Sequence, residues 1–223
     1  LKKIIRYSEP NKDKKTIFVW PEGVFSGYSY NEILIFKELF KKNFSKNHLI
    51  ILGSNKLDSN SGKYFNSMIV LDNNLEIIDE YNKRKLVPFG EFLPFESFLN
   101  NFGVKKITEG YGSFLHGDIN KNIIMDNFNI LPLICYEIIF TNLIQKSKEE
   151  TNLIVNISED GWFGDTVGPN QHFSKSVFRA IENNTFLIRS ANKGISAIID
   201  NKGNIIKQLN RNEAGNIELE IPL

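Results

Sequence analysis

The sequence predicts a single mixed α/β domain, and three of its features support this class. Short apolar runs alternate with turn residues along the chain, as in domains that pack helices against sheets. Two segments repeat apolar residues every three or four positions, which is the period of an amphipathic helix. No low-complexity segment and no linker rich in Pro, Gly or Ser divides the 223 residues, so we expect one unit.

Five continuous apolar runs are typical of strands that are covered on both faces, and they lie at residues 17–20, 49–52, 68–71, 130–135 and 153–157. Residues 69–78 and 197–206 each place Asp, Asn or Gly between β-branched runs. This pattern predicts two β-hairpins, because turns need residues that accept positive φ or bond to their own backbone.

Helical periodicity predicts helices at residues 30–44 and 172–184, and a third helix is expected at 137–146, directly after Cys135. Residues 86–117 differ from the rest, because they form a long stretch with many phenylalanines and weak periodicity, within which 95–102 could form a short helix. Such a stretch fits either a loop packed on the core or a functional loop that contacts an apolar substrate.

Charge and cysteine content narrow the functional classes. The chain has 27 basic and 26 acidic residues and no dominant basic stripe, which argues against a nucleic-acid partner. One cysteine allows no intrachain disulfide. The sequence contains neither a Walker loop nor a GxGxxG motif, and its three histidines (His48, His116 and His172) form no metal-binding spacing and give no support to a Cys/His dyad.

Cys135 lies where an apolar run meets an expected helix. The dipole and free N–H groups of a helix N-terminus favour a thiolate and can bind an oxyanion. A lone cysteine is more often a small buried hydrophobe, so this position alone does not assign catalysis. Glu22, in WPEG, follows the run 17–20, where α/β sheets collect catalytic groups. Lys83, in YNKRKLVPFGE, follows the first hairpin. Taken singly, Glu22 and Lys83 also fit surface loops.

The motifs WPEG, YNKRKLVPFGEFLP and LICYEIIF occur in an order that resembles the nitrilase (carbon–nitrogen hydrolase) superfamily. LVPFGEFLP, CYE, SEDGWFGDTVGPNQH and RSANKGISAIID are similar, more specifically, to the apolipoprotein N-acyltransferase family. The resemblance implies a catalytic triad of Glu22 as base, Lys83 as oxyanion partner and Cys135 as nucleophile. It also implies supporting or substrate-binding roles for Glu91, Tyr136, Glu137 and Trp162. The family's usual Ser-Asn-Asp-Ala-Trp run is here Ser-Glu-Asp-Gly-Trp, at residues 158–162.

This resemblance further implies an α-β-β-α sandwich, with residues 1–223 as a nitrilase-like catalytic domain. We expect the domain to be incomplete at its N-terminus, lacking its first strand–helix unit, of whose helix residues 1–7 would be the end. The family's membrane helices are also expected to lie outside the chain. The implied site of action is the bacterial inner membrane, with this domain on the periplasmic side.

The implied reaction moves a fatty acyl group from phospholipid, through a thioester on Cys135, to the N-terminal amine of a diacylglyceryl-cysteine apolipoprotein. It needs no metal or organic cofactor. Phe89, Phe92, Phe95 and Phe98 are candidates for a lipid-facing loop. Two alternatives stay open: a soluble nitrilase-like amidase that sends water to the thioester, and an inactive fragment or binding module that keeps only the fold.

Overall fold

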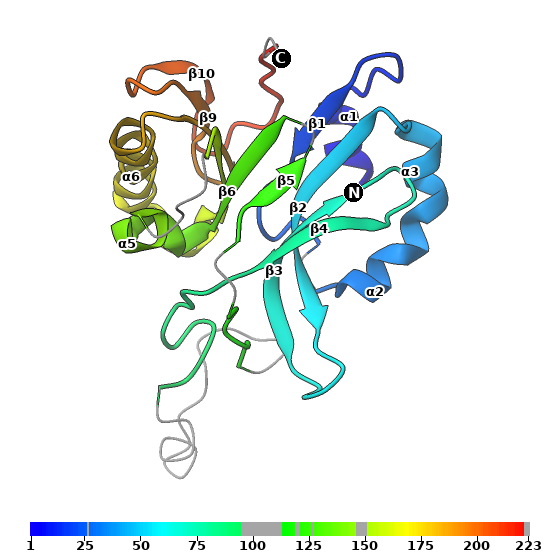
Figure 1. The fold of residues 1–223 in the computed structure, drawn as a ribbon, viewed down its shortest axis with the longest axis horizontal. Helices are drawn as coiled ribbons and strands as arrows, with labels where there is room; N and C mark the ends of the chain where they lie inside the picture. The colour runs from blue at the N-terminus through cyan, green and yellow to red at the C-terminus, as the bar shows by residue number, and fades with distance from the viewer. Residues whose placement is uncertain (26, 95–112, 119–120, 126, 146–150, 221–223) are drawn as a thin grey trace.

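Two β-sheets stack face to face between two layers of helices (Figure 1). The computed structural model describes residues 1–25, 27–94, 113–118, 121–125, 127–145 and 151–220. The strand order is β1-β2-β3-β4 in the first sheet and β10-β9-β8-β7-β6-β5 in the second.

The first sheet consists of β1 (Thr16–Val19), β2 (His48–Leu57), β3 (Tyr64–Leu71) and β4 (Ile77–Asn82). Strand β1 pairs in parallel with β2, and β3 and β4 follow in antiparallel register. As a result β1, β2 and β4 run in one direction. The outer face of this sheet is covered by helical segments α1 (Lys2–Ser8), α2 (Tyr30–Ile33), η1 (Leu34–Phe36) and α3 (Lys37–Asn43).

The second sheet consists of β5 (Ile123–Met125), β6 (Phe128–Ile134), β7 (Leu153–Glu159), β8 (Phe186–Asn192), β9 (Ser196–Ile199) and β10 (Ile205–Leu209). Strands β6, β7 and β8 are parallel, and the others pair in antiparallel fashion. Four helical segments follow its strands: η3 (Cys135–Ile139), α5 (Thr141–Gln145), η4 (Asp160–Phe163) and α6 (Gly168–Glu182). Helices α5 and α6 cover its outer face (Figure 1).

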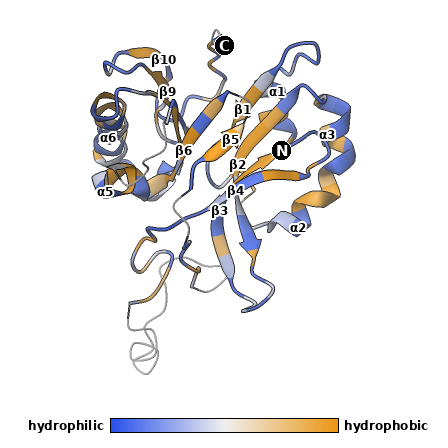
Figure 2. Cartoon of the chain, in the orientation of Figure 1, coloured by the Kyte–Doolittle hydropathy of each residue, from blue (hydrophilic) through white to orange (hydrophobic). Residues whose placement is uncertain are grey.

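Three separate hydrophobic clusters correspond to the three contacts between four layers. On β2, Ile50 and Leu52 pack against the first helical layer, whereas Ile51 packs between the sheets, as the alternation of side chains along a strand requires. The cluster between the sheets also contains Ile157, and the third joins β7 to α6 through Ile154 and other residues. Figure 2 shows the apolar residues concentrated on the strands. The predicted α-β-β-α sandwich is confirmed.

The predicted helices form, but with different bounds. Residues 30–44 form α2, η1 and α3 in succession, and no Gly or Pro marks the change from α to 3₁₀ geometry. Helix α6 begins at Gly168, four residues before the prediction, with Pro169 in its first turn, where a missing N–H costs little. Residues 135–139 form a 3₁₀ turn that is separate from α5, so no continuous helix starts beside Cys135.

Both predicted hairpins form, β3–β4 and β9–β10, and residues 2–8 are helical as expected. Strands β5 and β8 were not predicted, because β5 has three residues and β8 carries Arg189 and Asn192. In the stretch 86–117, the described residues form neither helix nor strand, and Phe95, Phe98 and the expected helix at 95–102 lie outside the described residues. Among the residues described, no helix has the length and apolar character needed to cross a bilayer.

Candidate active site

The predicted triad lies at one end of the sandwich, where strands of both sheets finish. Glu22 follows β1, Lys83 directly follows β4, and Cys135 directly follows β6. Because β1 and β4 run in the same direction, their carboxyl ends reach the same edge, and β6 meets them from the second sheet. A Cβ at Gly53 would lie 3.0 Å from Glu22 Cα, so glycine permits this close approach of β2 to the Glu22 segment.

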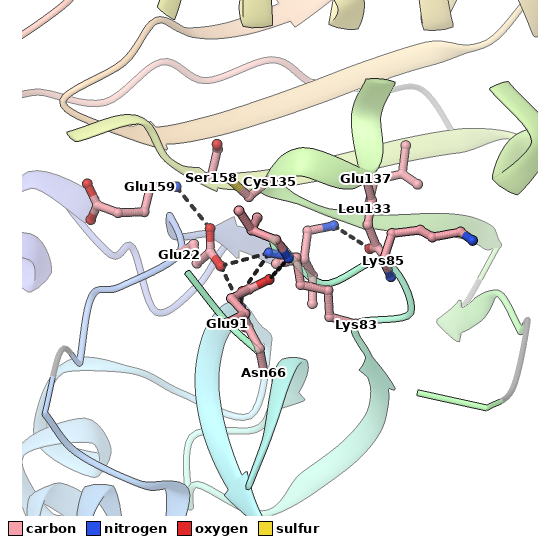
Figure 3. Close-up of polar contacts among 12 residues, drawn as sticks. Glu22, Asn66, Lys83, Lys85, Glu91, Leu133, Cys135, Glu137, Ser158 and Glu159 are labelled. Atoms are coloured by element: carbon pink, nitrogen blue, oxygen red, sulfur yellow. Dashed lines mark hydrogen bonds and ion pairs between the residues drawn. The ribbon is translucent and has the colours of Figure 1, made fainter. Parts of the chain in front are cut away.

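Lys83 is a buried cation between two carboxylates. Its side chain is 1% exposed, and its Nζ donates to Glu91 Oε1 at 2.8 Å and lies 3.7 Å from Glu22 Oε1 (Figure 3). Burial alone lowers the pKa of Lys83, but the charges of Glu22 and Glu91 outweigh it and raise this pKa. Lys83 is therefore an ammonium at neutral pH.

Asn66, on β3, links the same two carboxylates and was missed by the sequence analysis. Its Nδ2 donates to Glu22 Oε1 and to Glu91 Oε1, each at 2.7 Å. Backbone N–H groups hold the other oxygens: Glu159 donates to Glu22 Oε2 at 3.0 Å, and Val87 donates to Glu91 Oε2 at 2.8 Å. These hydrogen bonds fix the direction of both carboxylates. In the sequence, Asn66 is an ordinary polar residue near the start of an apolar strand, and no pattern marks it as part of the site.

Cys135 has a left-handed backbone, with φ of 48°, at the first position of η3. This conformation costs a non-glycine residue about 1–3 kcal/mol and persists only where the surroundings enforce it. The residue keeps some exposed surface, but the packing around its thiol, followed by the charge of Glu22, raises the pKa of Cys135 to about 12. The charge of Lys83 and a hydrogen bond with Ser158 act in the opposite direction without reversing the shift.

The thiolate expected from a helix N-terminus is therefore not the resting form. A five-residue 3₁₀ turn contributes little dipole, and burial disfavours the charged thiolate. At neutral pH the thiol keeps its proton, so attack on a carbonyl requires a base to accept it. Glu22 is the carboxylate whose charge acts most strongly on Cys135.

Glu137 ties the Lys83 segment to the end of β6. It is fully buried, and its Oε1 accepts from Tyr81 Oη at 2.9 Å and from the N–H groups of Arg84 and Lys85 at 2.7 and 3.0 Å. Its Oε2 accepts from Ile134 N–H at 2.9 Å. Burial raises the pKa of Glu137. Glu137 therefore acts on Lys83 through the backbone that follows it, whereas Glu91 contacts the ammonium directly.

The other predicted residues lie around this centre with different exposures. Tyr136 is half-buried, with its ring 5.0 Å from Phe140, and Trp162 on η4 is 66% exposed. Phe89 is exposed, while Phe92 packs against His116 with ring centroids 5.5 Å apart. No described contact joins a histidine to the thiol.

A family model described as carbon-nitrogen hydrolase matches residues 2–223. The chain belongs to the carbon–nitrogen hydrolase family. Apolipoprotein N-acyltransferase from Rhizobium leguminosarum is 36% identical over 215 residues, covering 93% of this chain and 40% of that protein. The protein of the same name from Rickettsia typhi is 41% identical over 189 residues, covering 83% and 38%. This carbon–nitrogen hydrolase chain thus spans about two fifths of these curated relatives.

A solved carbon–nitrogen hydrolase from Helicobacter pylori has the same fold. It superimposes with a TM-score of 0.66 at 15% sequence identity and covers 96% of this chain and 78% of that one. At this identity the likeness concerns the fold.

The charges around Cys135 predict opposite shifts in two variants of this carbon–nitrogen hydrolase. Glu22→Gln removes the negative charge that raises the pKa of Cys135, so its titration midpoint should fall from about 12. Lys83→Met removes the compensating positive charge, so the midpoint should rise. Ultraviolet absorbance of the thiolate during a pH titration measures both, and the exposed Glu76→Gln serves as control. An unchanged midpoint in Glu22→Gln would mean that Glu22 does not act on the thiol.

Proposed function

We propose that the chain is the catalytic domain of an apolipoprotein N-acyltransferase, with residues 1–223 as its nitrilase-like part. The substrates would be a phospholipid acyl donor and the N-terminal amine of a diacylglyceryl-cysteine apolipoprotein. The observation that carries the proposal is the buried Glu22–Lys83–Glu91 cluster beside Cys135. Relatives that are named for this activity and are 36% and 41% identical support the choice of substrates.

In the first half-reaction, the Cys135 sulfur attacks the ester carbonyl of the phospholipid while Glu22 accepts the thiol proton. The carbonyl oxygen becomes an oxyanion. Lys83 has three N–H donors, of which one goes to Glu91 and one faces Glu22, which leaves one for this oxyanion. The Tyr136 N–H is the first amide after the nucleophile and is the second donor. When the intermediate collapses, lysophospholipid leaves with the proton from Glu22, and the acyl group remains on sulfur.

In the second half-reaction, the α-amine of the lipid-modified cysteine attacks the thioester carbonyl. Glu22 accepts a proton from this amine, the same two donors stabilise the oxyanion, and the C–S bond breaks. Glu22 then returns its proton to the departing sulfur, which restores the resting thiol. A thioester suits this step because amines attack it more readily than they attack an ester.

Phe89 supports a lipid route to this site. It is 44% exposed and lies in the loop that begins after Lys83, two residues after Val87, whose N–H donates to Glu91. Contiguous exposed apolar patches mark interaction surfaces, and we propose that Phe89 belongs to such a patch. We infer that in the whole bacterial protein this loop faces the inner membrane from its periplasmic side, with the membrane-spanning parts supplied by other segments. Trp162, exposed on η4, is proposed to contact substrate as well.

A soluble amidase is the second candidate, because the family match itself concerns carbon–nitrogen hydrolysis. It would use the same base, ammonium and thiol but would send water to the thioester. An inactive fragment would keep the geometry and form no covalent intermediate.

These candidates differ in the fate of Cys135. When the full-length protein meets phospholipid vesicles without an amine acceptor, intact mass spectrometry should find one fatty-acyl adduct that hydroxylamine removes. Adding an amine acceptor should discharge the adduct with formation of an amide. An amidase would lose the adduct to water alone, and an inactive fragment would never form it. An adduct that persists in Cys135→Ser would exclude Cys135 as the nucleophile.

The exposed phenylalanine predicts a substrate-dependent loss. Phe89→Asn should lower turnover of bilayer phospholipid severalfold while sparing a short, water-soluble ester, because that ester reaches Cys135 without the loop. Asn tolerates the φ of 61° at this position, so the backbone should stay in place. Ile35→Asn is the control, since Ile35 is also exposed but lies on η1 in the outer helical layer. Equal losses on both substrates, with a lower melting temperature, would assign Phe89 to packing.

A further inference from the structure

A second buried polar cluster lies behind Cys135, away from the triad's carboxylates. We call it the Asp160 network, and its members come from β7, η4, α6 and β8. All of them are at most 5% exposed: Asn156, Ser158, Asp160, His172 and Arg189. Neither the predicted triad nor its supporting residues include any member. Such a set of buried polar groups is stable only if each finds a partner.

Asp160 is the centre of the network. Its Oδ1 accepts from Ser158 Oγ at 2.7 Å and lies 2.9 Å from His172 Nδ1. The Arg189 Nη2 donates to both of its oxygens, at 2.9 and 2.7 Å. Burial alone raises the pKa of Asp160, but the hydrogen bond from His172 and the charge of Arg189 lower it to about 2. Asp160 therefore stays ionised and anchors the His172 ring.

The network reaches the backbone of the nucleophile at two carbonyls. His172 Nε2 lies 3.1 Å from Cys135 O, and because a carbonyl oxygen only accepts, Nε2 is the donor in this contact. Asn156 Nδ2 donates to Leu133 O at 3.0 Å, and its Oδ1 accepts from Arg189. The strained Cys135 backbone is thus held from both sides by side chains that are themselves fixed.

The peptide plane between Cys135 and Tyr136 couples this carbonyl to the oxyanion donor. In a planar trans peptide the C=O and the following N–H point in opposite directions. His172 fixes the direction of Cys135 O, so it also fixes the direction of the Tyr136 N–H on the opposite side of that plane. The φ of 48° at Cys135 would otherwise relax, and this amide would turn with it.

We propose that His172, anchored by Asp160 and Arg189, is a positioning residue that aims the Tyr136 N–H and the Cys135 thiol at the reacting carbonyl. This inference rests on the assignment of Cys135 as nucleophile in the proposed function. It does not depend on phospholipid or lipoprotein as substrates, because any acyl donor that acylates Cys135 passes through the same oxyanion.

His48 provides a matched control. It is also buried, at 1% exposure, and its Nε2 lies 2.8 Å from a backbone carbonyl, that of Asn11. It sits at the first residue of β2, which is the opposite end of that strand from the site. Loss of His48 removes a buried histidine–carbonyl hydrogen bond without touching the nucleophile.

The test uses three His172 variants in the full-length protein. The amide of His172→Gln can reach the place of Nε2 and donate to Cys135 O, whereas the shorter side chain of His172→Asn reaches only toward Asp160. His172→Ala removes both contacts. The pre-steady-state burst with a short p-nitrophenyl ester measures acylation of Cys135 independently of lipid, and melting temperatures report folding.

We expect His172→Asn and His172→Ala to lower the maximal burst rate on the order of a hundredfold, as loss of an oxyanion donor does, with the half-saturating ester concentration nearly unchanged. His172→Gln should retain most of the rate, and free imidazole should partly restore His172→Ala. His48→Ala should lower the melting temperature without slowing the burst. Equal rates in the Gln and Asn variants, or losses that follow folded fraction alone, would overturn the proposal. If the His172 variants change the burst with the short ester as expected but the protein transfers no acyl group from phospholipid, only the proposed substrates would be rejected.

Discussion

The buried ammonium of Lys83 is the constraint on which the arrangement of the site depends. An unpaired buried cation would cost several kcal/mol, so the fold must bring anions to it. It does so from two directions, with Glu22 after β1 and Glu91 from the segment that follows Lys83 itself. Asn66 separates the two carboxylates and donates to both. Pairing the ammonium of Lys83 with two carboxylates therefore fixes the two loops that carry Glu22 and Glu91, and Asn66 links both loops to strand β3.

Cys135 lies between this cluster and the Asp160 network. The Lys83 cluster affects the charge of the thiol, and the Asp160 network affects the position of the backbone. The first surrounds the thiol with charges that, together with burial, keep it protonated until a base accepts the proton. The second holds the backbone carbonyls on either side of the turn, through His172 and Asn156. The thiol of Cys135 therefore reacts because Glu22 can accept its proton while the sulfur attacks, and not because it is a thiolate at rest.

Sequence patterns predicted the layered fold and the meeting of Glu22, Lys83 and Cys135, because apolar runs locate strands and the ordered motifs carry a family resemblance. They did not predict Asn66 or the network around Asp160. These residues are polar, and they bond to partners that are distant in the chain. Asn66 bonds Glu22, 44 positions away, and Asp160 bonds His172, 12 positions away. The charge state of the thiol was also missed, since it depends on burial and on neighbours from both sheets. Local pattern carries no information on such distant pairings.

The most direct test of the central claim is the free energy of unfolding in a mutant cycle at Lys83. Lys83→Met alone should destabilise by roughly 3–5 kcal/mol, because it leaves Glu22 and Glu91 facing each other without a cation. Adding Glu22→Gln and Glu91→Gln should recover much of that loss, since the neutral amides no longer need the ammonium. Losses that simply add across the three substitutions would show that the three charges are independent, and would contradict this account.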